Sequence, residues 1–129
     1  MRTTRTAELG FVVAIALATV AGCVGRPSVL DPAETGPEGV PLPATALETG
    51  PGGWQVPGAT FEQVRAWYEG KLPYGMPHDG WAWCERLRGD TYTQWNYHHP
   101  GTTDLLTVVV NADDPPSIQI GADSSSGPC

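Results

Sequence analysis

Proline and glycine set the first limit on what this chain can fold into, because they are crowded into one stretch. Residues 24–59 contain seven prolines and seven glycines, while their apolar residues are sparse and follow no period. Such a composition disfavours a packed core, and proline keeps the backbone extended. We therefore expect a disordered linker over residues 23–53. Trp54-Gln55-Val56 is the exception, and it places the start of the folded domain at residue 54.

A helix is predicted at the start of this domain, over residues 61–71. Thr60 and Gln63 match a capping box, and Glu62 and Lys71 have the charge order that suits the helix dipole. Pro73 ends the segment. The apolar residues recur at helical spacing along one face: Phe61, Val64, Trp67, Tyr68 and Leu72.

Four strands are predicted after the helix. Residues 81–88 and 91–98 flank Gly89-Asp90, a two-residue hairpin turn. Residues 105–111 and 117–122 alternate, with Pro115-Pro116 between them. The order predicts an α+β domain over residues 54–129, with one helix packed on a four-stranded antiparallel meander. The expected core is Phe61, Val64, Trp67, Leu72, Leu106, Val108, Val110, Ile118 and Ile120.

The first 22 residues have the layout of an export signal. Arg2 and Arg5 precede an apolar run over residues 9–21, which ends in small residues. As a helix this run is about 20 Å long, too short for the ~30 Å hydrocarbon core of a bilayer. The sequence therefore predicts a cleaved signal rather than a permanent span.

The end of this segment, Val20-Ala21-Gly22-Cys23, resembles the lipobox of bacterial lipoproteins, and the layout is similar to that of actinobacterial lipoproteins. The resemblance implies cleavage between Gly22 and Cys23, with a diacylglycerol and an acyl chain on Cys23. Two or more chains anchor a protein stably. The expected location is the cell membrane, facing the extracytoplasmic side. A secreted protein with a coincidental cysteine and a retained signal anchor stay open as alternatives.

Cysteine usage follows from this resemblance. If the lipid takes Cys23, then Cys84 and Cys129 remain as a pair, and an exported protein meets oxidising conditions. A disulfide is therefore expected, closing a loop worth roughly 4 kcal/mol in the chain-entropy model. Two free thiols are the alternative. Two cysteines are too few for a closed zinc site.

The charge of the chain excludes some partners. Without residues 1–22 it has five basic and 13 acidic residues, which gives a formal charge of −8. This surface repels phosphate backbones, so no nucleic-acid partner is expected. Attraction to anionic headgroups is equally unsupported, and the expected contact with the membrane is through the lipid.

Metal and catalytic motifs are sparse. His98 and His99 point to opposite faces of a strand, so they cannot hold one ion together. The sequence contains no nucleophile elbow, Ser-x-x-Lys pair or phosphate-binding loop. We expect no enzyme, no metal and no cofactor apart from the covalent lipid. A small extracytoplasmic hydrolase stays as an alternative, as does a passive envelope protein.

Acidic pairs and turn motifs have simple interpretations. Asp79 with Glu85 or Asp90 would need a cleft to act in acid–base catalysis. Residues 113–116, Asp-Asp-Pro-Pro, are typical of a turn. Arg88-Gly89-Asp90 matches the tripeptide that integrins recognise, but glycine and aspartate also suit a hairpin turn.

Tryptophan and tyrosine are concentrated between residues 54 and 97. In a two-residue hairpin, position 83 pairs with Asn96 and Cys84 pairs with Trp95. This register puts Cys84, Trp95 and Tyr97 on one face. The other face, a candidate partner surface, would hold Trp81, Trp83 and Tyr92. We therefore expect a binding or structural module for a protein or glycan of the cell envelope. The alternative is that these rings fill a thin core.

Overall fold

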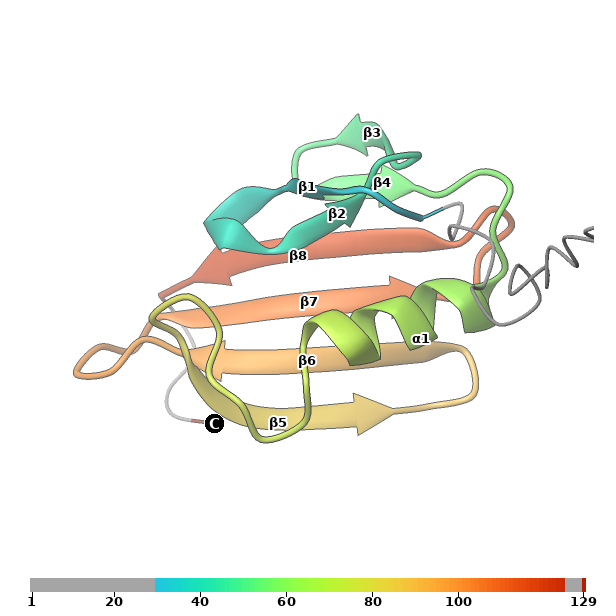
Figure 1. The fold of residues 1–129 in the computed structure, drawn as a ribbon. Coiled ribbons are helices and arrows are strands. Elements are labelled where there is room, and N and C mark those ends of the chain that lie inside the picture. Colours follow the sequence, from blue (N-terminus) through green and yellow to red (C-terminus); the bar gives the residue numbers. More distant parts are fainter. Residues whose placement is uncertain (1–29, 125–128) are drawn as a thin grey trace, which may run out of the picture.

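The computed structural model describes residues 30–124 and Cys129. They form an α+β domain with one α-helix and two antiparallel sheets, one six-stranded and one two-stranded (Figure 1). The described residues contain no helix long and apolar enough to cross a membrane. The predicted export signal, residues 1–22, and Cys23 lie outside the described residues.

The six-stranded sheet contains the predicted meander and extends it. Its strands are β3 (Leu47–Gly50), β4 (Gly53–Gln55), β5 (Ala82–Arg88), β6 (Tyr92–His98), β7 (Leu105–Asn111) and β8 (Ser117–Asp123). Their order is β3-β4-β8-β7-β6-β5, and every neighbouring pair is antiparallel. The expected four-stranded sheet is therefore wrong in its extent, because β4 adds to the free edge of β8.

The expected linker is wrong for residues 30–53, which are folded. They form a small hairpin of β1 (Ala33–Thr35) and β2 (Pro41–Pro43), joined by the 3-10 turn η2 (Pro37–Gly39). Proline cannot donate a backbone hydrogen bond to a neighbouring strand, but it is tolerated in edge strands. Both strands of this two-stranded hairpin are edge strands. The few apolar residues nevertheless reach the core, and the buried ones are Leu30, Val40 and Leu42.

Helix α1 (Phe61–Lys71) has the predicted bounds, and its capping box is formed. The Thr60 amide donates to Gln63 Oε1 at 2.9 Å, and the Gln63 amide donates to Thr60 Oγ1 at 3.2 Å. Both bonds satisfy amide groups that a helix start leaves unpaired. Val64 and Tyr68 are the buried residues of the helix. Its start is therefore encoded locally, and its position is set by its buried face.

The core lies on one face of the six-stranded sheet. Helix α1 packs across β6 and β7, and the β1–β2 hairpin lies on the same side, in front of β4 and β8 (Figure 1). Strand β7 alternates accordingly, with its buried residues toward the helix. Seven of the predicted core residues are buried, and the other two, Phe61 and Trp67, are partly buried against them.

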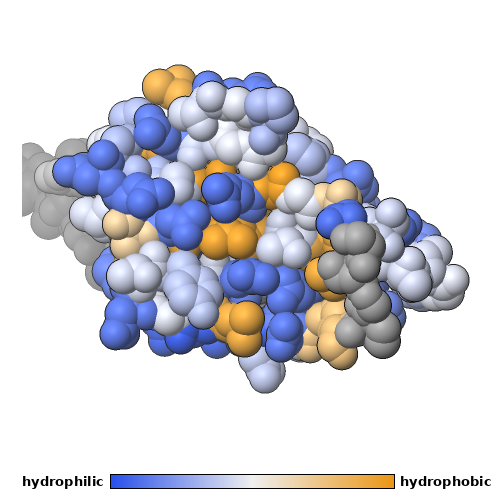
Figure 2. Space-filling model, turned by 180° about the vertical axis from the view of Figure 1, so that it is seen from behind, coloured by the Kyte–Doolittle hydropathy of each residue, from blue (hydrophilic) through white to orange (hydrophobic). Residues whose placement is uncertain are grey.

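The opposite face of the sheet is turned outward, and polar side chains dominate it (Figure 2). At its centre Asn96 donates to Glu85 at 3.0 Å and accepts from Gln94 at 2.9 Å and Thr107 at 3.2 Å. Asn96, Gln94 and Thr107 project from strand residues that alternate with buried residues of β6 and β7.

The burial of Leu30 tests whether the proline-rich segment belongs to the fold. Leu30 is 1% exposed, whereas Leu47 is 61% exposed. We expect Leu30→Ala to lower the free energy of unfolding by about 2–5 kcal/mol, because it removes buried methyl groups and leaves a cavity. Leu47→Ala is the matched control and is expected to change stability by less than about 0.5 kcal/mol. Equal denaturant midpoints for the two variants would contradict the packing described above.

Candidate binding site

A hollow opens at one end of the six-stranded sheet. Here the last residues of β6 and β8 and the first residues of β5 and β7 come together beside η2 (Figure 1). Its volume is about 390 Å³, and its lining combines two aromatic rings with three carboxylates. We call it the acidic hollow. The lining residues are Glu38, Trp81, His99, Asp104, Ala122, Asp123 and Ser124.

The aromatic wall of the hollow consists of Trp81 and His99. Their ring centroids are 5.4 Å apart, in an edge-to-face arrangement. Two backbone hydrogen bonds hold Trp81: its amide donates to the carbonyl of His78 at 2.7 Å, and its carbonyl accepts from the His78 amide at 2.9 Å. Trp81 is 7% exposed, so its ring is supported by the core while it borders the hollow.

Hydrogen bonds hold the loop between β6 and β7 in place. The His99 amide donates to the carbonyl of Asp104 at 3.1 Å, and the Thr102 hydroxyl donates to the carbonyl of His99 at 2.9 Å. The Thr103 hydroxyl donates to the carbonyl of Ser124 at 3.1 Å, which joins this loop to the end of β8. The loop therefore presents His99 and Asp104 in a defined geometry.

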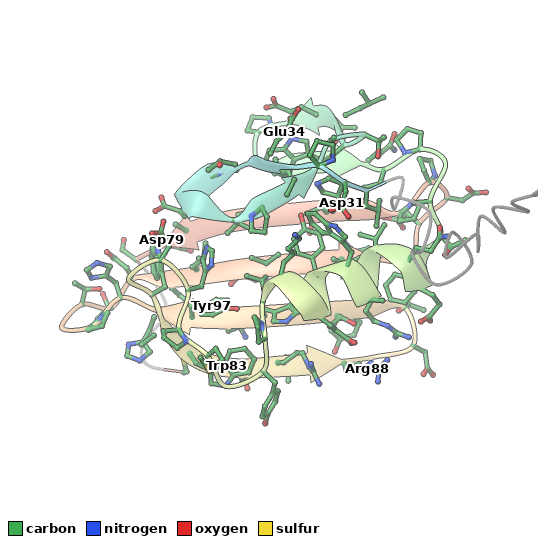
Figure 3. All side chains as sticks on the ribbon, viewed as in Figure 1. Asp31, Glu34, Asp79, Trp83, Arg88 and Tyr97 are labelled. Carbon is green, nitrogen blue, oxygen red and sulfur yellow. A yellow bond between two sulfur atoms is a disulfide. The ribbon has the colours of Figure 1, made fainter. Side chains whose placement is uncertain are left out.

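Two acidic residues near the hollow have unusual backbone conformations. Glu38 and Asp79 have φ angles of 54° and 44°, a left-handed region that non-glycine residues rarely adopt. Gly39 follows with φ of 72°, and a side chain there would collide with the Asp79 carboxylate. Figure 3 labels Asp79 on the loop that approaches η2. Such conformations persist where the surrounding structure imposes them, and they cluster at functional sites.

Positive charge is kept away from the hollow. In the described part of the chain, lysine and arginine lie on α1 and β5, and each contacts a ring or a carboxylate. Arg65 pairs with Glu62, Lys71 lies over Trp67, Arg86 lies over Tyr74 and Arg88 pairs with Glu69. The hollow itself is lined by carboxylates without lysine or arginine. Its potential therefore favours a cationic group.

The described residues include no group of three or more histidine, cysteine, aspartate or glutamate side chains arranged to hold a metal ion. His98 and His99 are separated as the strand geometry predicts: His98 pairs with Leu105 in the sheet, and His99 borders the hollow. The chemistry that this site offers is electrostatic attraction together with contact to aromatic rings.

A second hollow, of about 320 Å³, lies on the outward face near the β3–β4 turn. Three of its lining residues are glycines, which have no side chain to fill the space. Its lining contains no ionisable side chain. The lining residues are Pro51, Gly52, Gly53, Thr107, Val109, Gln119, Ile120 and Gly121. Its chemistry is less specific than that of the acidic hollow.

The predicted aromatic face is not formed. A β-bulge between Trp83 and Glu85 shifts the register, so that Trp83 pairs with Tyr97 and Asn96 pairs with Glu85. The hairpin also turns one residue later than expected, since the Gly89 amide donates to the carbonyl of Tyr92 at 2.8 Å and Arg86 pairs with Trp95. The expected pairs of position 83 with Asn96 and of Cys84 with Trp95 are therefore wrong, because this turn shifts the register by two residues and the bulge moves it back by one.

The three aromatic residues of that expected face are consequently dispersed. Trp83 lies on the core side, with its ring 5.7 Å from that of Tyr97 (Figure 3). Burial raises the pKa of Tyr97 to about 12. Trp81 borders the acidic hollow. Tyr92 pairs with Asn111 at the other end of the sheet and is 38% exposed.

The expected cysteine pair is formed. A disulfide joins Cys84 to Cys129, whose Cα atoms are 5.5 Å apart. It attaches the last residue of the chain to the bulge in the edge strand β5. Gly22 and Cys23, the predicted cleavage and lipidation residues, lie outside the described residues.

The remaining predicted motifs occupy connections between strands. The Asp113–Pro116 segment joins β7 to β8, and Ser117 Oγ donates to Asp113 Oδ2 at 2.6 Å. Of Arg88-Gly89-Asp90, Arg88 ends β5, and Gly89 and Asp90 lie in the β5–β6 connection. Asp79 and Glu85 do not pair: Glu85 accepts from Asn96 on the outward face.

Sequence reasoning missed the carboxylates of the acidic hollow. Asp104 and Asp123 flank the start of one predicted strand and the end of the next, and these positions meet at one end of an antiparallel pair. That signal was present in the sequence. Glu38 carried no comparable signal, because it lies in the stretch whose composition predicted a linker.

Comparison of the chain with protein-family models, with curated proteins and with solved structures found no match.

The disulfide gives a direct test of stability. Cys84→Ser opens a bridge with a sequence separation of 45, and we expect a loss of about 4 kcal/mol in the chain-entropy model. For a domain of this size that corresponds to a fall in Tm of roughly 10 °C or more. Thermal melts with and without reductant measure it, and the melt of Cys84→Ser itself should not respond to reductant. A wild-type Tm insensitive to reductant would contradict a structural role for the bridge.

Proposed function

We propose that the protein is a lipid-anchored binding module of the bacterial cell envelope, displayed on the extracytoplasmic side, and that its acidic hollow binds an ammonium group. The anchor is supported by the lipobox-like sequence that ends at Cys23. The Cys84–Cys129 disulfide is in keeping with an oxidising compartment. The observation that carries the binding role is the hollow itself, where rings and carboxylates converge without a lysine or arginine side chain.

The ligand chemistry follows from this lining. Trp81 supplies an aromatic surface, and a cation that contacts an aromatic ring gains about 0.5–1 kcal/mol at exposed sites. The carboxylates of Glu38 and Asp104 reach the lining from two different elements, η2 and the β6–β7 loop. Primary amines of envelope peptides and of amino sugars carry the matching charge. The partner is therefore an amine-bearing protein or glycan.

Titration with defined amines tests this proposal. We expect oligolysine and glucosamine oligomers to shift the indole N–H signal of Trp81 in NMR spectra, and their N-acetylated forms to leave it unchanged. High salt should weaken the response, because exposed charges are screened. A response to only one of the two amines identifies the source of the ligand. Equal responses to the free and the acetylated forms would contradict recognition of an ammonium group.

A matched pair of variants locates the binding site. Asp104 is half-buried beside the hollow, while Asp90 is exposed in the β5–β6 turn at the other end of the sheet. Asp104→Asn should weaken amine binding roughly two- to fivefold, because an exposed ion pair contributes up to about 1 kcal/mol. Asp90→Asn removes the same charge and should leave the affinity unchanged. Equal losses in the two variants would indicate attraction to net charge rather than to this hollow.

The anchor is tested by intact mass spectrometry of the membrane fraction. The expected mass lacks residues 1–22 and carries added acyl mass on Cys23, and Cys23→Ala should accumulate in the uncleaved form. A soluble, unacylated protein that begins at another residue would overturn this part of the proposal.

A further inference from the structure

The fold begins a short distance along the chain after Cys23. Leu30 is 1% exposed, and its carbonyl accepts a hydrogen bond from the Ala44 amide at 3.4 Å. Asp31 Oδ1 accepts from Trp67 Nε1 of the helix at 3.1 Å. Residues 30 and 31 therefore belong to the folded domain. Whatever the conformation of residues 24–29, the span from Cys23 to Leu30 cannot exceed about 25 Å.

The described chain enters the domain toward the end opposite the acidic hollow. From Leu30 it runs through β1 to η2, which borders the hollow, and β2 returns it to Ala44 beside Leu30 (Figure 1). Figure 3 shows Asp31 between this hairpin and α1, while Asp79 lies near η2. We call the opposite end the entry end. It holds the β5–β6 connection at residues 89–91 and the β7–β8 connection at residues 112–116.

The length of the sheet separates these two ends. The strands β5 to β8 each have seven residues, and a strand of that length spans about 20 Å. A tether that starts near the entry end and reaches about 25 Å at most would have to lie along the whole domain, nearly fully extended, to bring the hollow to the bilayer. Few conformations of the tether meet that condition, whereas many let the entry end approach the bilayer.

We propose that the short tether holds the domain with its entry end against the lipid headgroups and the acidic hollow facing away from the membrane. This proposal rests on the lipid anchor proposed above. It makes the membrane surface the partner of the entry end, and it leaves the hollow free to bind amines of the envelope beyond the bilayer.

The surface of the entry end fits contact with headgroups without insertion. Tyr92 and Leu47 are 38% and 61% exposed there, at the starts of β6 and β3. Tyrosine suits the headgroup level because its ring is apolar and its hydroxyl is polar. Asp90, Asp113 and Asp114 are exposed in the neighbouring connections and oppose deeper burial. The tether, rather than attraction to anionic lipids, therefore sets the orientation, so that it should form on zwitterionic bilayers.

Paramagnetic broadening by a headgroup-bound gadolinium chelate measures this orientation. The full chain is expressed, and its membrane-bound form is reconstituted into phosphatidylcholine nanodiscs. The amide signals of Asp90 and Asp113 should lose most of their intensity, while those of Thr102 and Asp104 should keep theirs. Equal or stronger loss at Thr102 and Asp104 would overturn the proposal.

A longer tether is the matched control. A long Gly-Ser insertion between Val24 and Gly25 leaves every described residue unchanged but removes the restriction, because a long Gly-Ser chain behaves as a random coil. The difference in broadening between Asp90 and Thr102 should then shrink. If the difference persists unchanged, the tether is not its cause and the proposal fails.

The anchor and the orientation can fail separately. Intact mass shows whether the membrane-bound chain carries acyl groups on Cys23. If it does not, the anchor proposal fails, and a lipid maleimide coupled to Cys23 of a chain that begins there still measures the orientation, since Cys84 and Cys129 are paired. Broadening at the hollow in that sample would reject the orientation on its own.

Discussion

The side chain of Tyr68 holds the three layers of this small domain together. It projects from α1, its ring centroid lies 5.9 Å from that of Trp95 in β6, and its hydroxyl donates to the carbonyl of Pro41 in β2 at 2.7 Å. Desolvation by burial raises the pKa of Tyr68 far above that of a free tyrosine. The hydroxyl therefore stays protonated and can donate this hydrogen bond. One residue thus fixes the helix, the β1–β2 hairpin and the sheet relative to one another. Because η2 is part of that hairpin, the position of Glu38 beside the hollow depends on this contact as well.

Local signals in the sequence were sufficient for the helix and the meander. The Thr60–Gln63 capping box and Pro73 define the helix, and alternation in residues 105–111 defines the face of β7 that is buried. The β1–β2 hairpin could not be predicted in this way. Leu30, Val40 and Leu42 follow no period, and their burial depends on tertiary contacts with α1 and β8. Composition measures how many apolar residues a segment has, but a segment that covers an existing core needs very few.

Register was the second limit of sequence reasoning. The hairpin between β5 and β6 was found, but it turns between Gly89 and Tyr92, one residue later than predicted. The bulge at Cys84 has no local sequence signature, and it reverses the face on which Trp83 lies. The candidate surface of three aromatic residues depended on that register and is not formed. The acidic hollow, in contrast, depends on which strand ends meet, and that is a property of the whole antiparallel order. Trp81 was predicted to be part of the aromatic surface. It instead lines the acidic hollow, because the start of β5 lies at that end of the sheet.

The bulge and the disulfide on β5 also bear on how this domain tolerates crowding. Both outer strands of a sheet present unpaired backbone groups that can join a neighbouring molecule. Here one edge is the four-residue β3, and the other is β5, which is interrupted by the bulge at Cys84 and contains Arg86 and Arg88. An irregular, cross-linked and charged edge lets many copies stand side by side without merging into a continuous sheet.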